Sequence, residues 1–259
     1  MSFIARLAER AERLRAGAAS IPRRVSEAVP TRVKQGVTLP VRLVAQRKKR
    51  ENGATVMRRP PDKTYTLFAG VNGAGKTSLY RILNKYEDLG VRVNIDEIVA
   101  SEGNWMDDVL QINASRKALR IIGECIEKGR SFNQETTLPT QTVVRQIKKA
   151  RDAGYHIRLY FVGVENLETA IKRVRRRVEK GGHGIDEKLI RQRFEKLPET
   201  LRHILPLVDT AFFYDNTVKF IQVALVRNNV IVDCENDIPV WFWELIARAR
   251  HKSDGALKA

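Results

Sequence analysis

Short apolar runs separated by longer amphipathic stretches make up most of the chain from about residue 63 onward. The run "TYTLFAG" at 64–70 and the run "YHIRLYFVG" at 155–163 are rich in β-branched and aromatic residues, which is typical of buried strands. Further strands are predicted at 91–94, 130–138 and 209–217. Helical periodicity lies between these runs. Strands that alternate with helices favour a mostly parallel sheet.

Three of the amphipathic stretches predict helices of the domain. The stretch 105–129 places Val109, Ile112, Leu119, Ile122 and Ile126 at helical spacing, and we expect all five to pack into the core. Two helices, at 165–180 and 186–205, are joined by a glycine-rich turn. A β-hairpin with Asn228 and Asn229 at its turn and a closing helix at 238–252 complete the predicted elements.

Charge divides the chain of 259 residues into two unequal parts. Residues 1–60 contain 15 Lys and Arg against 4 Asp and Glu, whereas the other 199 residues contain 32 against 26. We therefore predict a basic arm at 1–62, with an amphipathic helix and a Pro-broken linker, and a globular domain at 63–259. The arm is interpreted as a solvated extension, an anionic-membrane contact, a nucleic-acid tether or a transit peptide.

The predicted compartment follows from what the sequence lacks. Cys125 and Cys234 have no metal-ligand spacing, no apolar run reaches the length of a membrane span, and the N-terminus has no secretory apolar region. We expect a cytoplasmic protein.

A phosphate-binding loop follows the first strand. Gly70, Gly73, Gly75, Lys76 and Thr77 fit the pattern G-x-x-x-x-G-K-[ST] between a predicted strand and a predicted helix. Such a loop turns its N–H groups toward phosphate oxygens, with the positive helix end behind them. Lys76 would reach the β- and γ-phosphates, and Thr77 would offer its hydroxyl to Mg²⁺. The predicted nucleotide contacts are Gly70, Asn72, Gly73, Ala74, Gly75, Lys76, Thr77 and Ser78.

These features together predict an α/β fold of the P-loop NTPase type. We expect three layers, with a mostly parallel sheet and helices on both faces. The Arg-bearing helix pair at about 170–200 would form a lid, and the β-hairpin and the last helix would lie at the C-terminal end. ATP and Mg²⁺ are the expected cofactors.

Two groups of polar residues follow other predicted strands. Asp96 comes directly after the strand at 91–94, where it could accept a proton from an acceptor hydroxyl or cap the next helix. Glu135 and Thr137 end the strand at 130–138. They could bind the hydroxyl groups of a sugar or cap the following helix, and composition alone does not separate these readings.

The predicted lid carries five arginines between 173 and 193, of which we expect two to act in catalysis. Arg173 and Arg177 are four residues apart and share a helix face, and Arg193 lies on the second helix. Lid arginines can neutralise the charge on a transferring phosphoryl group. His183, in the turn "GGHGI", is interpreted as a structural or hydrogen-bonding residue rather than a metal ligand or base.

Several stretches together resemble the short single-domain members of the zeta-toxin family of P-loop kinases. They are "FAGVNGAGKTSLYR", "VNIDEI", "FNQETTL", "RVRRRVEKGGHGI", "RQRF" and "FYDNT". The resemblance implies a kinase that transfers the γ-phosphate of ATP to a hydroxyl of a UDP-N-acetylhexosamine such as UDP-N-acetylglucosamine. A separate antitoxin protein is a further partner that it implies.

The resemblance also implies roles for individual residues. Asp96 matches the general base, Glu135 and Thr137 match acceptor contacts, and Arg177 and Arg193 match the lid arginines. Arg173 competes with Arg177 for its role. Pro198 departs from the family pattern and is expected to interrupt the helix that carries Arg193.

Two other functions remain open from the sequence. One is an RNA or nucleoside kinase that uses the basic arm as a nucleic-acid tether. The other is a nucleotide-binding, membrane-associated protein without catalytic activity, although Asp96, Glu135 and the arginine lid argue against it.

Overall fold

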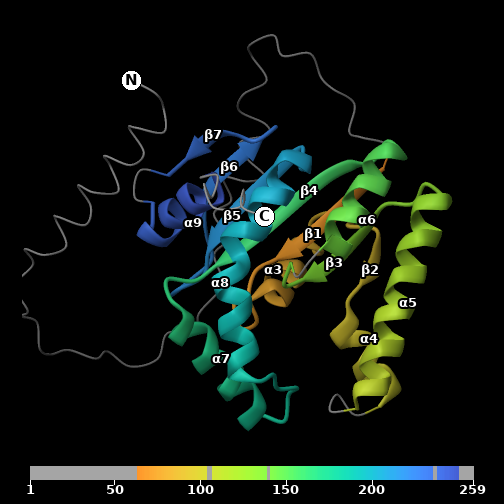
Figure 1. Cartoon of the computed structure of the whole chain (residues 1–259), viewed down its shortest axis with the longest axis horizontal. Helices are drawn as coiled ribbons and strands as arrows, with labels where there is room; N and C mark the ends of the chain where they lie inside the picture. Colours follow the sequence, from red (N-terminus) through yellow and green to blue (C-terminus); the bar gives the residue numbers. More distant parts are fainter. Residues whose placement is uncertain (1–62, 104–106, 139–140, 236–237, 251–259) are drawn as a thin grey trace, which may run out of the picture. The chain divides into compact units, whose positions relative to one another are not determined.

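A seven-stranded sheet forms the centre of the domain in the computed structural model, which describes residues 63–103, 107–138, 141–235 and 238–250 (Figure 1). The strand order is β2-β3-β1-β4-β5-β6-β7. The first five strands pair in parallel, and β6 and β7 add to the β5 edge as antiparallel strands. Helices lie on both faces of the sheet. The predicted three-layer α/β fold of the P-loop NTPase type is confirmed.

The strands begin and end close to the predicted runs. They are β1 (Thr64–Ala69), β2 (Val91–Val93), β3 (Phe132–Thr136), β4 (His156–Gly163), β5 (Thr210–Asp215), β6 (Ile221–Arg227) and β7 (Val230–Cys234). The helices are α3 (Lys76–Leu83), α4 (Ile95–Glu102), α5 (Asp108–Glu127), α6 (Gln141–Asp152), α7 (Leu167–Glu179), α8 (Glu187–Ile204) and α9 (Val240–Arg250), and a 3₁₀ turn, η1 (Leu205–Leu207), follows α8.

The core is built on β1 and β4, which pair with each other at the middle of the sheet. Tyr65, Leu67 and Phe68 of β1 are fully buried, as are Ile157 and Leu159 of β4. Central parallel strands are covered on both faces, so they are apolar almost continuously instead of alternating. The carboxyl ends of these strands therefore meet at one edge of a rigid sheet, which is where ligands bind in folds of this kind.

The C-terminal hairpin has the predicted turn. Asn228 and Asn229 both have positive φ angles, of 47° and 62°, which a two-residue turn of type I′ requires and which asparagine tolerates better than most residues. The last helix, α9, buries Phe242 and Trp243 against the body.

Helix α5 forms where it was predicted, but it buries a different face. Val109, Ile112 and Leu119 are exposed, with 65%, 52% and 46% of their surface accessible, so the prediction that they pack into the core was wrong. Ile122 and Ile126 are buried as expected, and the remaining inward positions are filled by the small residues Ala114, Ala118 and Cys125. Small side chains allow the helix to lie close to its neighbours, and the larger residues are left on the outer face.

Helix α8 runs through Pro198 without a break, which corrects the expectation that proline interrupts it. Proline removes one N–H donor from the helix ladder, but burial of its ring offsets part of that cost. Pro198 is buried, as are Leu197 and Leu201 beside it. Because the helix is continuous, Arg193 stands on the same helix as these buried residues.

The predicted lid consists of α7, a glycine-rich turn and α8, and it has a small core of its own. Leu167, Ile171 and Val174 of α7 pack against Ile190 of α8. Ile185 and Phe194 pack against this cluster and are partly buried. The two helices therefore anchor both ends of the turn between them.

The predicted basic arm at 1–62 lies outside the described residues. Within the residues that are described, no helix is long and apolar enough to cross a membrane.

Candidate active site

The loop between β1 and α3 is folded tightly against two neighbouring segments. Gly70 and Gly73 have φ angles of 141° and 81°, in the region that favours glycine. A Cβ atom would lie 2.2 Å from the carbonyl oxygen of Val162 at Gly70, and 2.3 Å from that of Ala170 at Gly73. Neither carbonyl can move without distorting β4 or α7. These two positions therefore require glycine on steric grounds alone.

The N-terminus of α3 is left open for an anion. Its N-cap residue, Gly75, makes no side-chain capping bond, and the first turn contains no acidic residue. The N–H groups at this end are thus free of the usual side-chain acceptors, and the helix dipole adds positive potential. Lys76 is buried, and its Nζ donates to the carbonyl oxygen of Val71 at 3.1 Å within the same loop.

Two side chains from distant segments hold the outside of the loop. Asn216, just after β5, donates through Nδ2 to the carbonyl oxygen of Ala74 at 2.7 Å. Arg193 of α8 donates to Oδ1 of Asn72 at 2.8 Å. The loop is therefore tied to the sheet on one side and to the lid on the other. Ser78, predicted as a nucleotide contact, is exposed.

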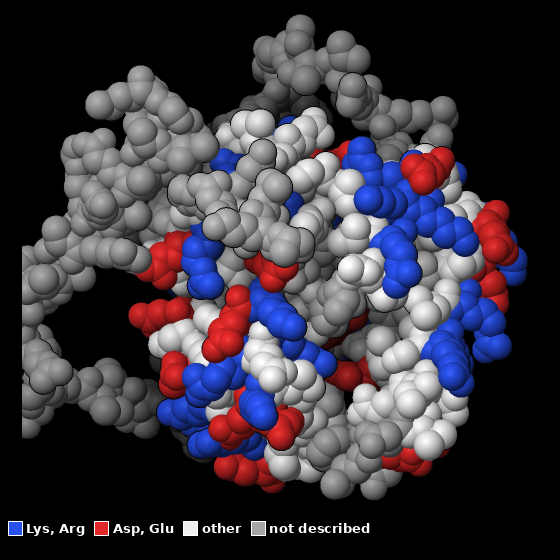
Figure 2. Space-filling model, viewed as in Figure 1, with Lys and Arg blue, Asp and Glu red and all other residues white. Residues whose placement is uncertain are grey.

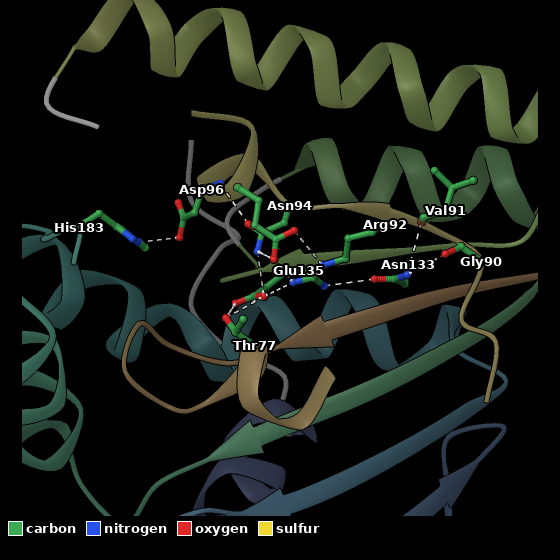
Figure 3. A network of polar contacts seen from close by, with 10 residues as sticks. Thr77, Gly90, Val91, Arg92, Asn94, Asp96, Asn133, Glu135 and His183 are labelled. Carbon is green, nitrogen blue, oxygen red and sulfur yellow. Dashed lines mark hydrogen bonds and ion pairs between the residues drawn. The ribbon is translucent and has the colours of Figure 1, made fainter. Parts of the chain in front are cut away.

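Glu135 lies at the centre of a polar network between the loop and β2 (Figure 3). Its carboxylate accepts hydrogen bonds from the hydroxyl of Thr77 at 2.8 and 3.0 Å, from Nη2 of Arg92 at 2.6 Å and from Nδ2 of Asn94 at 3.1 Å. The Glu135 side chain is only 10% exposed. Glu135 does not cap the following helix; it connects the phosphate loop to β2.

Arg92 is a site residue that sequence reasoning missed. Its guanidinium group lies 3.7 Å from the centre of the Tyr80 ring and also pairs with Glu97 and Asn133. An arginine stacked on an aromatic ring loses few conformations when it binds a carboxylate, so it holds Glu135 in place. The only signal in the sequence was a charged residue in the middle of a short apolar strand.

Asp96 is not the cap of its helix. Asn94 is the N-cap of α4, and its Oδ1 accepts from the backbone N–H of Asp96 at 3.0 Å. The Asp96 side chain instead points toward the lid, where Nε2 of His183 lies 2.8 Å from its Oδ2 (Figure 3). The contact is an ion pair when the imidazole is protonated. The capping interpretation of Asp96 is therefore wrong, and its carboxylate faces the space above the loop.

The charges around this space shift several pKa values. Partial burial raises the pKa of the Asp96 carboxyl, but the contact with His183 and the positive charges of Lys76 and Arg177 outweigh it and hold the pKa below its usual value. Burial lowers the pKa of the Lys76 ammonium, and the carboxylates of Glu135 and Asp96 oppose that shift. Asp96 is thus ionised at neutral pH and can accept a proton.

Arg173 and Arg177 have different surroundings although they share a helix face. Arg177 faces Asp96 and Glu135, whose charges act on its guanidinium, and its Nη2 is buried without a hydrogen-bond partner among the described residues. Arg173 donates to the carbonyl oxygen of Thr217 at 3.0 Å and has Asp215 as its charged neighbour, and its Nη1 is likewise buried without a hydrogen-bond partner among the described residues. The charged neighbours therefore distinguish the two arginines: Arg177 lies beside the carboxylates of the site, whereas Arg173 braces the segment after β5.

The structure brings most of the predicted residues into one cluster. Lys76 of α3, Arg177 of α7 and Arg193 of α8 supply positive charge, and Asp96 and Glu135 supply carboxylates. Figure 2 shows a hollow between the lid and the α4–α5 side of the domain, with acidic side chains visible inside it. A cluster of this kind can bind a polyphosphate and deprotonate a hydroxyl beside it.

Thr137, a predicted acceptor contact, has no polar partner among the described residues. It follows β3 and is partly buried, and residues 139–140 beyond it lie outside the described part of the chain.

The strand order, the glycine loop ahead of α3 and the cationic lid define a P-loop kinase. Solved structures support the fold. The AvrRxo1-ORF1:AvrRxo1-ORF2 structure with sulphate ions aligns with a TM-score of 0.54 at 17% identity, over 74% of this chain and 65% of that one. The ORF1:ORF2 structure with ATP gives 0.53 at 18% identity, over 75% and 66%. This chain therefore spans slightly less than two thirds of those chains, and the likeness shows the fold alone.

Comparison at the level of sequence shows the family. The zeta-toxin family profile matches residues 46–223. An uncharacterized protein of Haemophilus influenzae is 28% identical over 128 residues, which cover 49% of this chain and 90% of that protein. The chain belongs to the zeta-toxin family, and it is an ATP-dependent kinase.

Proposed function

We propose that this kinase transfers the γ-phosphate of ATP to a hydroxyl group of a UDP-amino-sugar such as UDP-N-acetylglucosamine. Membership of the zeta-toxin family supports the acceptor class. The observation that carries the proposal is the position of Asp96, whose carboxylate is ionised, free of any capping role and near Lys76 and Arg177. A base beside a cluster of cations is what the transfer of a phosphoryl group to an alcohol requires.

The donor side of the site holds ATP. The N–H groups of the loop from Gly70 to Ser78 would surround the β- and γ-phosphates, with the open end of α3 behind them. Lys76 would leave the carbonyl oxygen of Val71 and pair with phosphate oxygens. Arg193, bound to Asn72 at the edge of the loop, would contribute charge from the lid side.

The residues at the start of α3 fit Mg²⁺. The Thr77 hydroxyl and the Glu135 carboxylate lie within hydrogen-bond distance of each other, and oxygen ligands of this kind are what Mg²⁺ prefers. Thr77 would hold the ion, with Glu135 fixing the hydroxyl in place. When bound, Mg²⁺ neutralises the charge that develops on the phosphate oxygens.

The acceptor would approach from the side of α4. Asp96 takes the proton of the acceptor hydroxyl while the oxygen of that hydroxyl forms a bond to the γ-phosphorus. The bond between the γ-phosphorus and the bridging oxygen then breaks, and ADP leaves with that electron pair. Arg177 stabilises the equatorial oxygens of the transferring group. Glu135 and Thr137 are the proposed acceptor contacts, and Glu135 would link the acceptor side to Thr77 of the donor loop.

An antitoxin protein is a proposed partner, on the ground of family membership. Contact of the arm at 1–62 with an anionic membrane or a nucleic acid stays a prediction.

The acceptor class is tested by a screen with the full chain. ATP labelled in the γ-phosphate is incubated with Mg²⁺ and, in separate reactions, UDP-amino-sugars, nucleosides and tRNA. The expected result is label on a UDP-amino-sugar and none on the other two classes. Label on RNA or a nucleoside would replace the proposal with the alternative kinase function, and label in inorganic phosphate alone would remove the acceptor assignment.

A further inference from the structure

The turn between α7 and α8 is held in a defined shape at the tip of the lid. The N–H of Gly182 donates to the carbonyl oxygen of Arg177 at 2.9 Å, and a Cβ at Gly182 would lie 2.6 Å from Cγ of Arg177. On the far side of the turn, Ile185 packs against the lid core. Only His183 and Gly184 lie between these two anchors. The position of His183 is therefore set by the lid.

His183 makes contacts in two directions. Its carbonyl oxygen accepts from Nε of Arg177 at 2.8 Å. Its imidazole Nε2 lies 2.8 Å from Oδ2 of Asp96, which is an ion-pair distance, although the geometry is not that of a hydrogen bond and Nε2 has no hydrogen-bond partner among the described residues. The first contact stays within the lid, whereas the second crosses to α4 (Figure 3). One residue thus connects the lid arginine that is directed at the phosphate with the carboxylate that faces the acceptor.

We infer that His183 is a positioning residue that aligns the Asp96 base and couples its alignment to the lid. This inference rests on the proposed function, because it assumes that Asp96 takes the acceptor proton. The side chain of Asp96 is half exposed in the first turn of α4, and a carboxylate in such a place can rotate. The charge of a protonated His183 beside Oδ2 restrains this rotation and leaves Oδ1 for the acceptor hydroxyl.

The contact also explains why the turn carries Arg177 and His183 together. Arg177 has a buried Nη2 without a hydrogen-bond partner among the described residues, directed at the space above the loop. Because its Nε holds the carbonyl oxygen of His183, the lid position that brings Arg177 to the phosphate also brings the imidazole to Asp96. The Asp96 base and the Arg177 guanidinium are therefore placed together when the lid is in this position. This arrangement favours transfer of the phosphoryl group to the acceptor over hydrolysis of ATP by water.

Kinetics of His183 variants test this role. In His183→Ala, kcat for acceptor phosphorylation should fall about 10- to 100-fold, as expected for a reacting group displaced by roughly 1 Å, while KM for ATP stays within about twofold. His183→Gln keeps a side-chain donor and should recover part of the rate. The control is His203→Ala, since His203 is exposed on α8 and should leave kcat unchanged.

A double-mutant comparison separates alignment of the base from a structural role. In the Asp96→Asn background, His183→Ala should cost no further rate, because there is no base left to align. If His183→Ala costs the same factor in both backgrounds, or if kcat does not change in the wild-type background, the positioning role is wrong. In both cases the proposed function stands.

A measurement without turnover tests the contact itself. The side-chain NMR resonance of His183 can be assigned among the 4 histidines by its loss in His183→Gln. It should move when Asp96 is replaced by Asn and stay in place in the control Glu97→Gln. An unchanged resonance in Asp96→Asn overturns the inference. If the resonance moves but the wild-type chain phosphorylates no acceptor, the proposed function fails while the contact between His183 and Asp96 remains.

Discussion

Replacement of Glu135 by glutamine should destabilise the domain strongly, because it breaks a nearly buried ion pair without changing the shape of the side chain. The Glu135 and Arg92 side chains are only 10% and 15% exposed, and their atoms lie 2.6 Å apart. In Glu135→Gln one carboxylate oxygen is replaced by an NH₂ donor, which either faces Arg92, itself only a donor, or forces the Thr77 hydroxyl to turn and accept. Neutralising one partner of a nearly buried ion pair lowers the free energy of unfolding by about 2 to 3 kcal/mol.

The chain supplies a matched control for this change. Glu97 pairs with the same Arg92 nitrogen at 3.0 Å, but its side chain is 48% exposed. Solvent screens an exposed pair, so Glu97→Gln should cost less than about 1 kcal/mol. The two variants remove the same charge from the same arginine, and they differ chiefly in burial and in the bond to Thr77.

Thermal unfolding of the full chain, followed by calorimetry, measures the difference. For a domain of this size about 1 kcal/mol shifts Tm by roughly 2 to 4 °C, so Glu135→Gln should lower Tm by about 4 to 12 °C and Glu97→Gln by less than about 4 °C. Equal shifts of Tm in the two variants would refute the reasoning that burial makes the Glu135–Arg92 pair more stabilising than the exposed Glu97–Arg92 pair.

Three further predictions concern the lid, the loop and pH. Arg177→Ala should lower kcat about 10³-fold or more, since lid arginines act on the transferring phosphoryl group, whereas Arg173→Ala should mainly lower the stability of the domain. Steady-state kinetics and Tm measurements distinguish the two effects. Equal losses of kcat in the two variants would contradict the assignment. Gly73→Ala should abolish nucleotide binding measured by calorimetry, because its Cβ would overlap the carbonyl oxygen of Ala170, and unchanged affinity would contradict this. The pKa of Asp96 is lower in the folded chain, so its carboxylate stabilises the fold above the ordinary aspartate pKa, and that contribution is lost as pH falls through the folded pKa. Asp96→Asn should therefore be slightly less stable than wild type at pH 6, and the difference should shrink as the pH falls below the ordinary aspartate pKa. Urea unfolding at pH 6 and in acid would show this, and a difference that does not shrink in acid would point to another cause.

Much of the fold could be predicted because its signals are local. The apolar run of β1, the glycines after it and the helical period of α3 lie within twenty residues of one another, and together they specify a strand, a loop and a helix. The paired asparagines of the hairpin turn act over an even shorter distance. Such signals depend on backbone sterics and periodicity, which any stretch of sequence carries within itself.

The outward face of α5 could not be predicted because it depends on what the helix packs against. Its sequence has large apolar residues on one side and small ones, Ala114 and Ala118, on the adjacent side. Periodicity alone favours the larger residues. The neighbouring elements select the smaller ones, since these permit a closer approach.

The contacts of the site depend on pairs that are far apart in the chain. Thr77 and Glu135 are 58 positions apart, and nothing local indicates that their side chains meet. His183 was interpreted as a structural or hydrogen-bonding residue, but its neighbour Asp96 could not be predicted, since that contact requires the lid to lie against α4. Pro198 shows the converse, because a strong local preference was overridden by burial of the proline ring.

The central claim is that Asp96 takes the proton of a sugar hydroxyl while the phosphate loop holds ATP. The most direct test is transfer of labelled γ-phosphate from ATP to UDP-N-acetylglucosamine by the full chain, compared with Asp96→Asn at equal ATP occupancy. The account predicts a phosphorylated UDP-sugar with wild type and a yield about 10² to 10⁴ times lower with Asp96→Asn, the range for loss of a general base. Equal yields from the two proteins would contradict it.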